Sequence, residues 1–136
     1  MANQNAHLSL AELERIAEKI LKLSAAEETE VDVSAATDAL TRFANNTIHQ
    51  NVAEHSLGIS VRAVVNGRTA RASTNKTDEE SLRRVVASAV TLARNQPENP
   101  DLLPLLCKQK YQKVSRFFRA TAETSPQDRA KAVTRV

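Results

Sequence analysis

The sequence predicts an α+β fold: an antiparallel β-meander of four to five strands with two helices packed on one face, followed by a C-terminal tail and helix. Two segments repeat apolar residues at the spacing of a helix. Between them, short runs alternate apolar and polar residues with the period of a strand. The chain has 136 residues, of which 41% are hydrophobic, and this suits one domain with its own core plus a tail.

Each predicted helix begins with a capping box, in which two side chains satisfy backbone N–H groups that the first turn leaves without partners. Ser9 and Glu12 begin the first helix, whose apolar positions continue for about four turns. Thr77 and Glu80 begin the second helix, which ends before Pro97 because proline cannot continue a helix.

The predicted strands lie between these helices. Their segments are 29–35, 38–44, 47–52, 57–65 and 68–74. Asn66 and Gly67 form the residue pair favoured in a type I′ hairpin turn, because both residue types tolerate a positive φ. Asn45 and Asn46 make a similar but weaker turn signal. The sequence therefore predicts consecutive hairpins.

Composition divides the chain into four parts. We expect a disordered leader at 1–7, an α+β domain at 8–96, a connector with three prolines at 97–106 and a basic tail at 107–136. Ser125 followed by a proline is typical of a helix start, with serine as the N-cap and proline as the first helical residue. Because no glycine or proline ends this helix, we expect it to be the start of the next domain, in a natural protein that continues.

Charge and hydropathy limit the partners and the compartment. The basic tail holds eight Lys or Arg and two acids, which permits binding to nucleic acid, although a solvated segment whose partner is missing explains it better. The sequence has neither a run of 18 apolar residues nor a signal peptide, so we expect no membrane contact. A single cysteine, Cys107, fits the reducing cytoplasm.

No complete catalytic or metal-binding motif is present. The histidines, His7, His49 and His55, lack the spacing of a zinc-binding helix, and one cysteine cannot form a thiolate cage. Only two glycines occur, so a phosphate-binding loop and a nucleophile elbow are absent. We therefore predict no catalytic residue, no metal ligand and no cofactor in this chain.

Uncharged hydrogen-bonding side chains are concentrated on one predicted hairpin, which we call the polar hairpin. They are Thr41, Arg42, Asn45, Asn46, His49, Gln50 and Asn51, with Arg42 as the charged member. Such side chains can line a groove that holds a peptide backbone. They can equally form the solvent-exposed face of the hairpin, and their spacing alone favours this second interpretation.

Several segments in this order resemble a known family. They are Thr41 to Gln50, Gly58 to Arg68, Ala72 to Asn75, Ala87 to Arg94, the proline-rich connector, and Ser-Pro-Gln-Asp-Arg-Ala at 125–130. The set is similar to the N-terminal domain of the TldD/PmbA family, also called modulators of DNA gyrase, over most of residues 10–136. The resemblance implies cytoplasmic zinc metallopeptidases, or inactive partners of them, that act as homodimers or heterodimers on peptides or unfolded polypeptides. It also implies that zinc is bound in a C-terminal domain missing from this sequence.

Three functions follow in order of preference. The first is the non-catalytic N-terminal part of such a peptidase, which shapes the substrate passage and the dimer. The second is a peptide-binding adaptor without peptidase activity, which captures extended peptide through the polar hairpin or an exposed strand edge. The third and weakest is nucleic-acid binding through the basic tail, which would depend steeply on salt.

Overall fold

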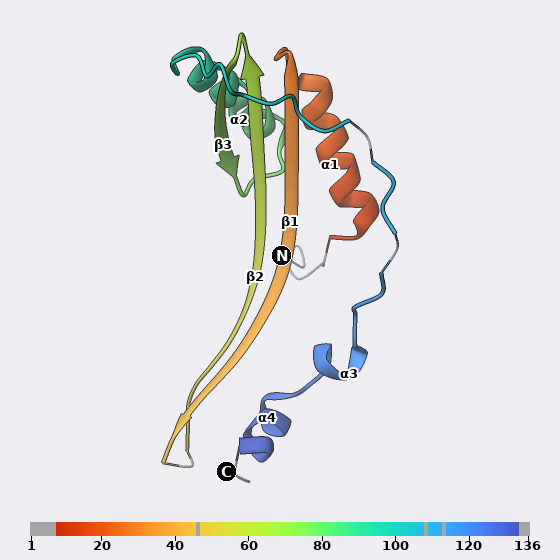
Figure 1. Cartoon of the computed structure of the whole chain (residues 1–136). Coiled ribbons are helices and arrows are strands. Elements are labelled where there is room, and N and C mark those ends of the chain that lie inside the picture. The colour runs from red at the N-terminus through yellow and green to blue at the C-terminus, as the bar shows by residue number, and fades with distance from the viewer. Residues whose placement is uncertain (1–7, 46, 108, 113, 134–136) are drawn as a thin grey trace. The chain divides into compact units, whose positions relative to one another are not determined.

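The computed structural model describes residues 8–45, 47–107, 109–112 and 114–133. The predicted leader at 1–7 and Asn46 therefore lie outside the described residues. The elements are α1 (Leu10–Leu23), β1 (Glu28–Ala44), β2 (Thr47–Val65), β3 (Arg68–Thr74), α2 (Glu79–Arg94), α3 (Arg119–Ala122) and α4 (Pro126–Val133) (Figure 1). No helix among these residues is long and apolar enough to cross a membrane.

The chain forms two compact units. Unit 1 comprises Met1–Ala36 and Ser56–Cys107, and unit 2 comprises Thr37–His55 and Lys108–Val136. Strands β1 and β2 each contribute residues to both units. Residues 108–136 of the predicted basic tail are therefore grouped with the polar hairpin in unit 2.

The first predicted helix start is confirmed and the second is shifted by one residue. Ser9 Oγ accepts a hydrogen bond from the backbone N–H of Glu12, and Glu12 Oε2 accepts one from the backbone N–H of Ser9 at 2.7 Å, which completes the predicted capping box. The prediction of Thr77 as the cap of α2 is wrong. Asp78 caps this helix by accepting a hydrogen bond from Ser81 N at 2.9 Å, while Glu80 pairs with an arginine one turn later.

The sheet has three strands, in the order β1–β2–β3, and not the four to five that the sequence predicted. Segments 29–35 and 38–44 join into β1, and segments 47–52 and 57–65 join into β2. The two residues between the first pair, Ala36 and Thr37, contain no glycine or proline to end a strand. Gly58 lies inside β2 without interrupting it, with Ser34 beside the position of its missing Cβ. Local alternation identified strand residues but not the strand ends.

The turn between β2 and β3 has the predicted type I′ geometry. Asn66 and Gly67 both have positive φ, at 49° and 67°. The antiparallel register pairs Val65 with Arg68, next to the turn, and continues to the pairing of Ile59 with Thr74. This register places the apolar side chains of β2 and β3 on a common face.

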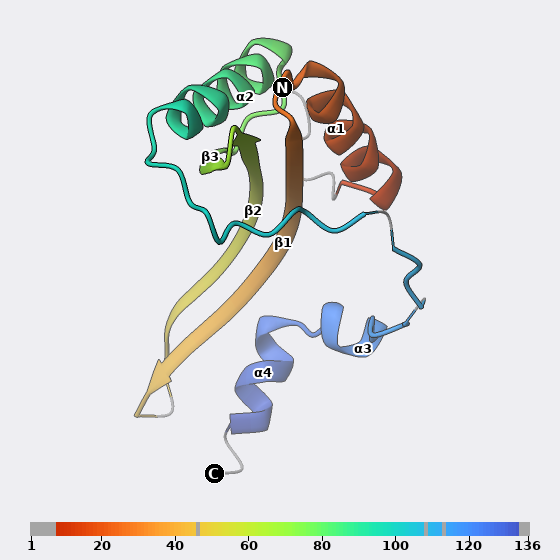
Figure 2. The same cartoon turned by 45° about the horizontal axis from the view of Figure 1, so that its top comes forward.

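Both long helices cover that face of the sheet in unit 1 (Figure 2). The core consists of aliphatic side chains from one face of β2 and from the inner stripes of the helices. Its buried members are Ile20, Ile59, Val61, Ala63, Leu82, Val85, Val86, Ala89, Val90 and Ala93. This arrangement confirms the predicted α+β class with two helices on one face.

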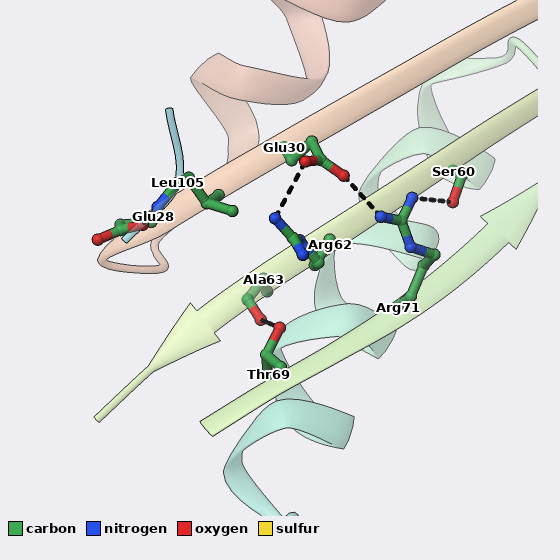
Figure 3. Close-up of polar contacts among 8 residues, drawn as sticks. All are labelled: Glu28, Glu30, Ser60, Arg62, Ala63, Thr69, Arg71 and Leu105. Atoms are coloured by element: carbon green, nitrogen blue, oxygen red, sulfur yellow. Dashed lines mark hydrogen bonds and ion pairs between the residues drawn. The ribbon is translucent and has the colours of Figure 1, made fainter. Parts of the chain in front are cut away.

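The opposite face of the sheet carries an ion-pair network (Figure 3). Glu30 on β1 accepts hydrogen bonds from Arg62 at 3.0 Å and from Arg71 at 2.6 Å, so one carboxylate joins all three strands. The proline-rich connector also lies against unit 1, since Leu105 N donates to a Glu28 carboxylate oxygen at 2.6 Å. Leu105 of the connector therefore lies against the sheet face that the helices leave open.

Candidate functional site

The polar hairpin is held together across its two strands. Thr41 on β1 donates a hydrogen bond from Oγ1 to Oδ1 of Asn51 on β2, at 2.9 Å. Closer to unit 1 along the same strands, Thr37 Oγ1 lies 2.8 Å from Nδ1 of His55. Side-chain hydrogen bonds thus add to the backbone ladder at two levels of the hairpin.

Arg129 on α4 binds both strands of the polar hairpin. Its Nε donates to Thr41 Oγ1 at 3.0 Å, and its Nη2 donates to Asn51 Oδ1 at 3.3 Å. Its Nη1 donates to the carbonyl oxygen of Thr124 at 2.8 Å. A guanidinium suits this position because its planar fork presents several N–H donors at once. We call Arg129, Thr41, Asn51 and Thr124 the Arg129 clamp.

The start of α4 places Arg129 in the clamp. Pro126 is the first residue of the helix, and Ser125 caps it by accepting a hydrogen bond from Asp128 N at 3.1 Å. The Ser125 hydroxyl in turn donates to the Asp128 carboxylate at 2.6 Å, and Arg129 N bonds to the Ser125 carbonyl. The predicted helix start at Ser125 is therefore confirmed, and it fixes the backbone from which the guanidinium extends.

Hydrogen bonds from the side chain and then the backbone of Ser125 hold the pKa of Asp128 below its ordinary value. Because the folded pKa is depressed, the cap contributes stability above the ordinary aspartate pKa and loses it as pH falls through the depressed value. We expect Ser125→Ala to raise the Asp128 pKa toward its ordinary value, as measured by an NMR titration of the side-chain carboxyl carbon. Gln127→Ala, on the same turn, is the control. An unchanged Asp128 pKa in Ser125→Ala would contradict the cap.

Two of the polar residues predicted on the hairpin, Thr41 and Asn51, belong to the clamp. Thr41 is half-buried there, whereas Arg42, His49 and Gln50 are exposed. Asn45 is exposed at the hairpin turn with a φ of 50°, and its carbonyl accepts a hydrogen bond from Thr47. The predicted partner in that turn, Asn46, lies outside the described residues. Whether the exposed members contact a substrate stays a prediction.

Sequence reasoning missed Arg129. It lies 88 residues from Thr41 and 78 residues from Asn51, so no spacing rule links them. One sequence feature indicated a role for Arg129, which is its position in the first turn of the helix predicted to begin after Ser125. A cation near a helix N-terminus is unfavourable for the helix dipole, which suggests a partner elsewhere.

Unit 2 also exposes every aromatic side chain of the protein. The exposed fractions are 45% for Phe43, 87% for Tyr111, 75% for Phe117 and 70% for Phe118. Leu40 and Ile48 of the hairpin are also about half exposed, at 48% and 45%. Apolar side chains exposed in this number are typical of a surface that another polypeptide covers.

The described residues contain no group of three or more His, Cys, Asp and Glu that could hold a metal ion. His49 is exposed on the hairpin and His55 contacts Thr37, and among the described residues neither belongs to such a group. The exposed Cys107 belongs to unit 1.

The family model described as PmbA/TldA metallopeptidase domain 1 matches residues 29–93. This span runs from the start of β1 into the last turn of α2, so it includes the polar hairpin but not Arg129. Residues 29–93 carry the first domain of the TldD/PmbA family. The resemblance seen in the sequence is thereby confirmed.

Two solved structures share the fold of this chain. TldE from Thermococcus kodakarensis matches with a TM-score of 0.70 at 18% identity, over 84% of this chain and 25% of its own. A putative modulator of DNA gyrase from Bacteroides thetaiotaomicron VPI-5482 matches with a TM-score of 0.64 at 14% identity, over 95% of this chain and 30% of its own. The chain therefore spans less than a third of either protein. None of the curated proteins matches it.

Proposed function

We propose that the chain is the non-catalytic N-terminal part of a TldD/PmbA-type zinc metallopeptidase that cleaves peptides or unfolded polypeptides. The observation that carries the proposal is the match of residues 29–93 to the first domain of that family. In this role the domain works in the cytoplasm, within a homodimer or a heterodimer with another family member. It helps to shape the passage through which the substrate reaches the catalytic domain.

The zinc of such an enzyme has no fitting site in the described part of this chain. Zinc in proteins takes three or four His, Cys, Asp or Glu ligands, and the described residues include no cluster of three. The proposal therefore assigns zinc to a C-terminal domain, and it assigns this chain no chemical step.

The polar hairpin is the part of the chain best suited to line a substrate passage. Its exposed side chains include His49 and Gln50, which can hydrogen-bond to a peptide backbone of any sequence. Arg129 binds both strands, so the hairpin presents these groups from a fixed backbone. Groups that bind the peptide backbone select little between sequences, and the hairpin holds these groups in place. Both properties suit an enzyme that accepts unfolded polypeptides.

The exposed aromatic side chains of unit 2 support a role inside a larger assembly. Tyr111, Phe117 and Phe118 lie along the tail, and Phe43 lies on the hairpin. Burying them against a catalytic domain or a dimer partner would remove apolar surface from water, at roughly 25 cal/mol for each Å². This stabilisation would attach unit 2 to the rest of the assembly.

Hydrolysis of fluorescently labelled casein by the protein encoded by the complete gene tests this function. We expect cleavage that stops after dialysis against EDTA and returns when zinc is added. A double His49→Ala, Gln50→Ala variant should raise KM by about threefold at similar kcat, because it removes binding groups without touching the reaction. Gln96→Ala, an exposed change in unit 1, should leave both constants unchanged. A full-length product that binds no zinc and cleaves no casein would overturn the proposal.

A further inference from the structure

Strand β3 has one side without a strand neighbour. The sheet order is β1–β2–β3, so among the described residues β3 pairs only with β2. Val65 and Arg68 flank the two-residue turn and therefore form a hydrogen-bonded pair, after which hydrogen-bonded and non-hydrogen-bonded pairs alternate. The backbone N–H and C=O groups of Thr69, Arg71 and Ser73 consequently point toward the outer side of β3. An extended chain can bond to groups in this arrangement.

A groove of about 220 Å³ lies between this edge and α2, within unit 1. Ala72, Ser73 and Thr74 of β3 line one side, and Arg84 and Ser88 of α2 line the other. A strand edge beside a helix offers both parts of a peptide-binding groove. The edge bonds to the peptide backbone, and the helix contacts alternate side chains of the peptide.

The two charged residues that line the groove, Lys76 and Arg84, are both positive. The arginines of β3 are paired elsewhere, Arg68 with Glu98 and Arg71 with Glu30. Arg84 pairs with Glu80, whose side chain is exposed, so an acidic ligand can compete for the guanidinium. A second copy of β3 at this edge would offer no acidic side chain to Lys76 and Arg84, because β3 contains none.

We propose that the outer edge of β3 and the groove beside α2 bind an extended, acidic segment of a partner protein as a fourth strand. The segment bonds to the backbone at Thr69, Arg71 and Ser73, and its acidic side chains pair with Lys76 and Arg84. Arg71 holds its side chain toward Glu30 on the opposite sheet face, so it does not block the groove. The site lies outside the polar hairpin and does not depend on the proposed peptidase function.

Fluorescence anisotropy with a labelled peptide tests the edge. The probe is fluorescein–Val-Glu-Val-Asp-Val-Glu, and its lysine-substituted counterpart is the control peptide. Ser73→Pro removes an outward N–H without removing a bond to β2, and we expect it to weaken binding at least about tenfold. Ser73→Ala keeps the N–H and should bind within about twofold of the unmodified chain. If Ser73→Pro does not fold, a probe methylated on alternate backbone nitrogens tests the same bonds.

Two substitutions test the charges. Arg84→Gln and Lys76→Gln should each weaken binding about threefold and reduce its dependence on salt. Arg94→Gln lies on the same helix but outside the groove. It should change neither the affinity for the peptide nor the dependence of that affinity on salt. Equal binding of the acidic and lysine peptides, or full binding by folded Ser73→Pro, would overturn the proposal. A dimer in light scattering that Ser73→Pro dissociates would also overturn it, because the edge would then belong to a second copy of the chain.

Discussion

Replacing Leu82 with alanine is expected to lower the free energy of unfolding of unit 1 by about 3 kcal/mol. Leu82 lies on α2, is 1% exposed, and is among the largest fully buried side chains of the core. Truncating it removes apolar contacts and leaves a cavity between α2 and the sheet. The remaining core is aliphatic, with no aromatic side chain to fill the space.

Urea denaturation followed by circular dichroism at 222 nm measures this loss. The matched control is Leu92→Ala, which makes the same change on the same helix at a side chain that is 44% exposed. We expect the control to cost less than about 1 kcal/mol, because little contact is lost and alanine favours the helix. Equal costs for the two variants would show that α2 does not pack on the sheet as described.

Local sequence signals predicted unit 1 well because local interactions define its elements. Ser9 and Glu12, three residues apart, hydrogen-bond to each other. Asn66 and Gly67 have positive φ, which asparagine and glycine tolerate better than other residue types. Alternation along β2 and β3 indicated the face that the helices cover. Errors occurred where two local solutions compete, as at Thr77 and Asp78, adjacent residues that can both cap α2.

Strand length was predicted poorly because strand ends depend on long-range pairing. Residues 36 and 37 show no strong alternation, yet they continue β1 because β2 lies beside them. A local pattern records which face a residue occupies but not whether a neighbouring strand continues. The sequence therefore predicted five strand segments where the structure has three strands.

The Arg129 clamp could not be predicted for a related reason. The polar residues of the hairpin were recognised by type, but the sequence left open whether they line a groove or face solvent. Two of them, Thr41 and Asn51, hydrogen-bond to one another and to Arg129 on α4. Thr41 is half-buried, whereas Asn51 is exposed, as are Arg42, His49 and Gln50. Contacts between residues far apart in the sequence, and not residue type, therefore identify the pair that α4 holds.

Replacing Arg129 with alanine is expected to release the polar hairpin from α4. The change removes the hydrogen bonds to Thr41, Asn51 and the Thr124 carbonyl. Hydrogen bonds from a charged donor are worth about 1.5–3 kcal/mol each when buried, and this half-buried group should contribute about 2 kcal/mol in total. Amide hydrogen exchange in residues 37–44 and 47–55 should accelerate roughly 30-fold, while exchange in the core of unit 1 stays unchanged.

Three further variants make this experiment specific. Arg129→Lys keeps the charge but not the planar fork, so it should restore only part of the protection. Gln127→Ala, an exposed position of α4, should leave the hairpin as protected as before. Thr41→Val removes the shared hydroxyl, and its effect should not add to that of Arg129→Ala, because both break the same hydrogen bond. Full additivity of these two changes, or unchanged exchange in Arg129→Ala, would show that the clamp does not hold the hairpin in solution.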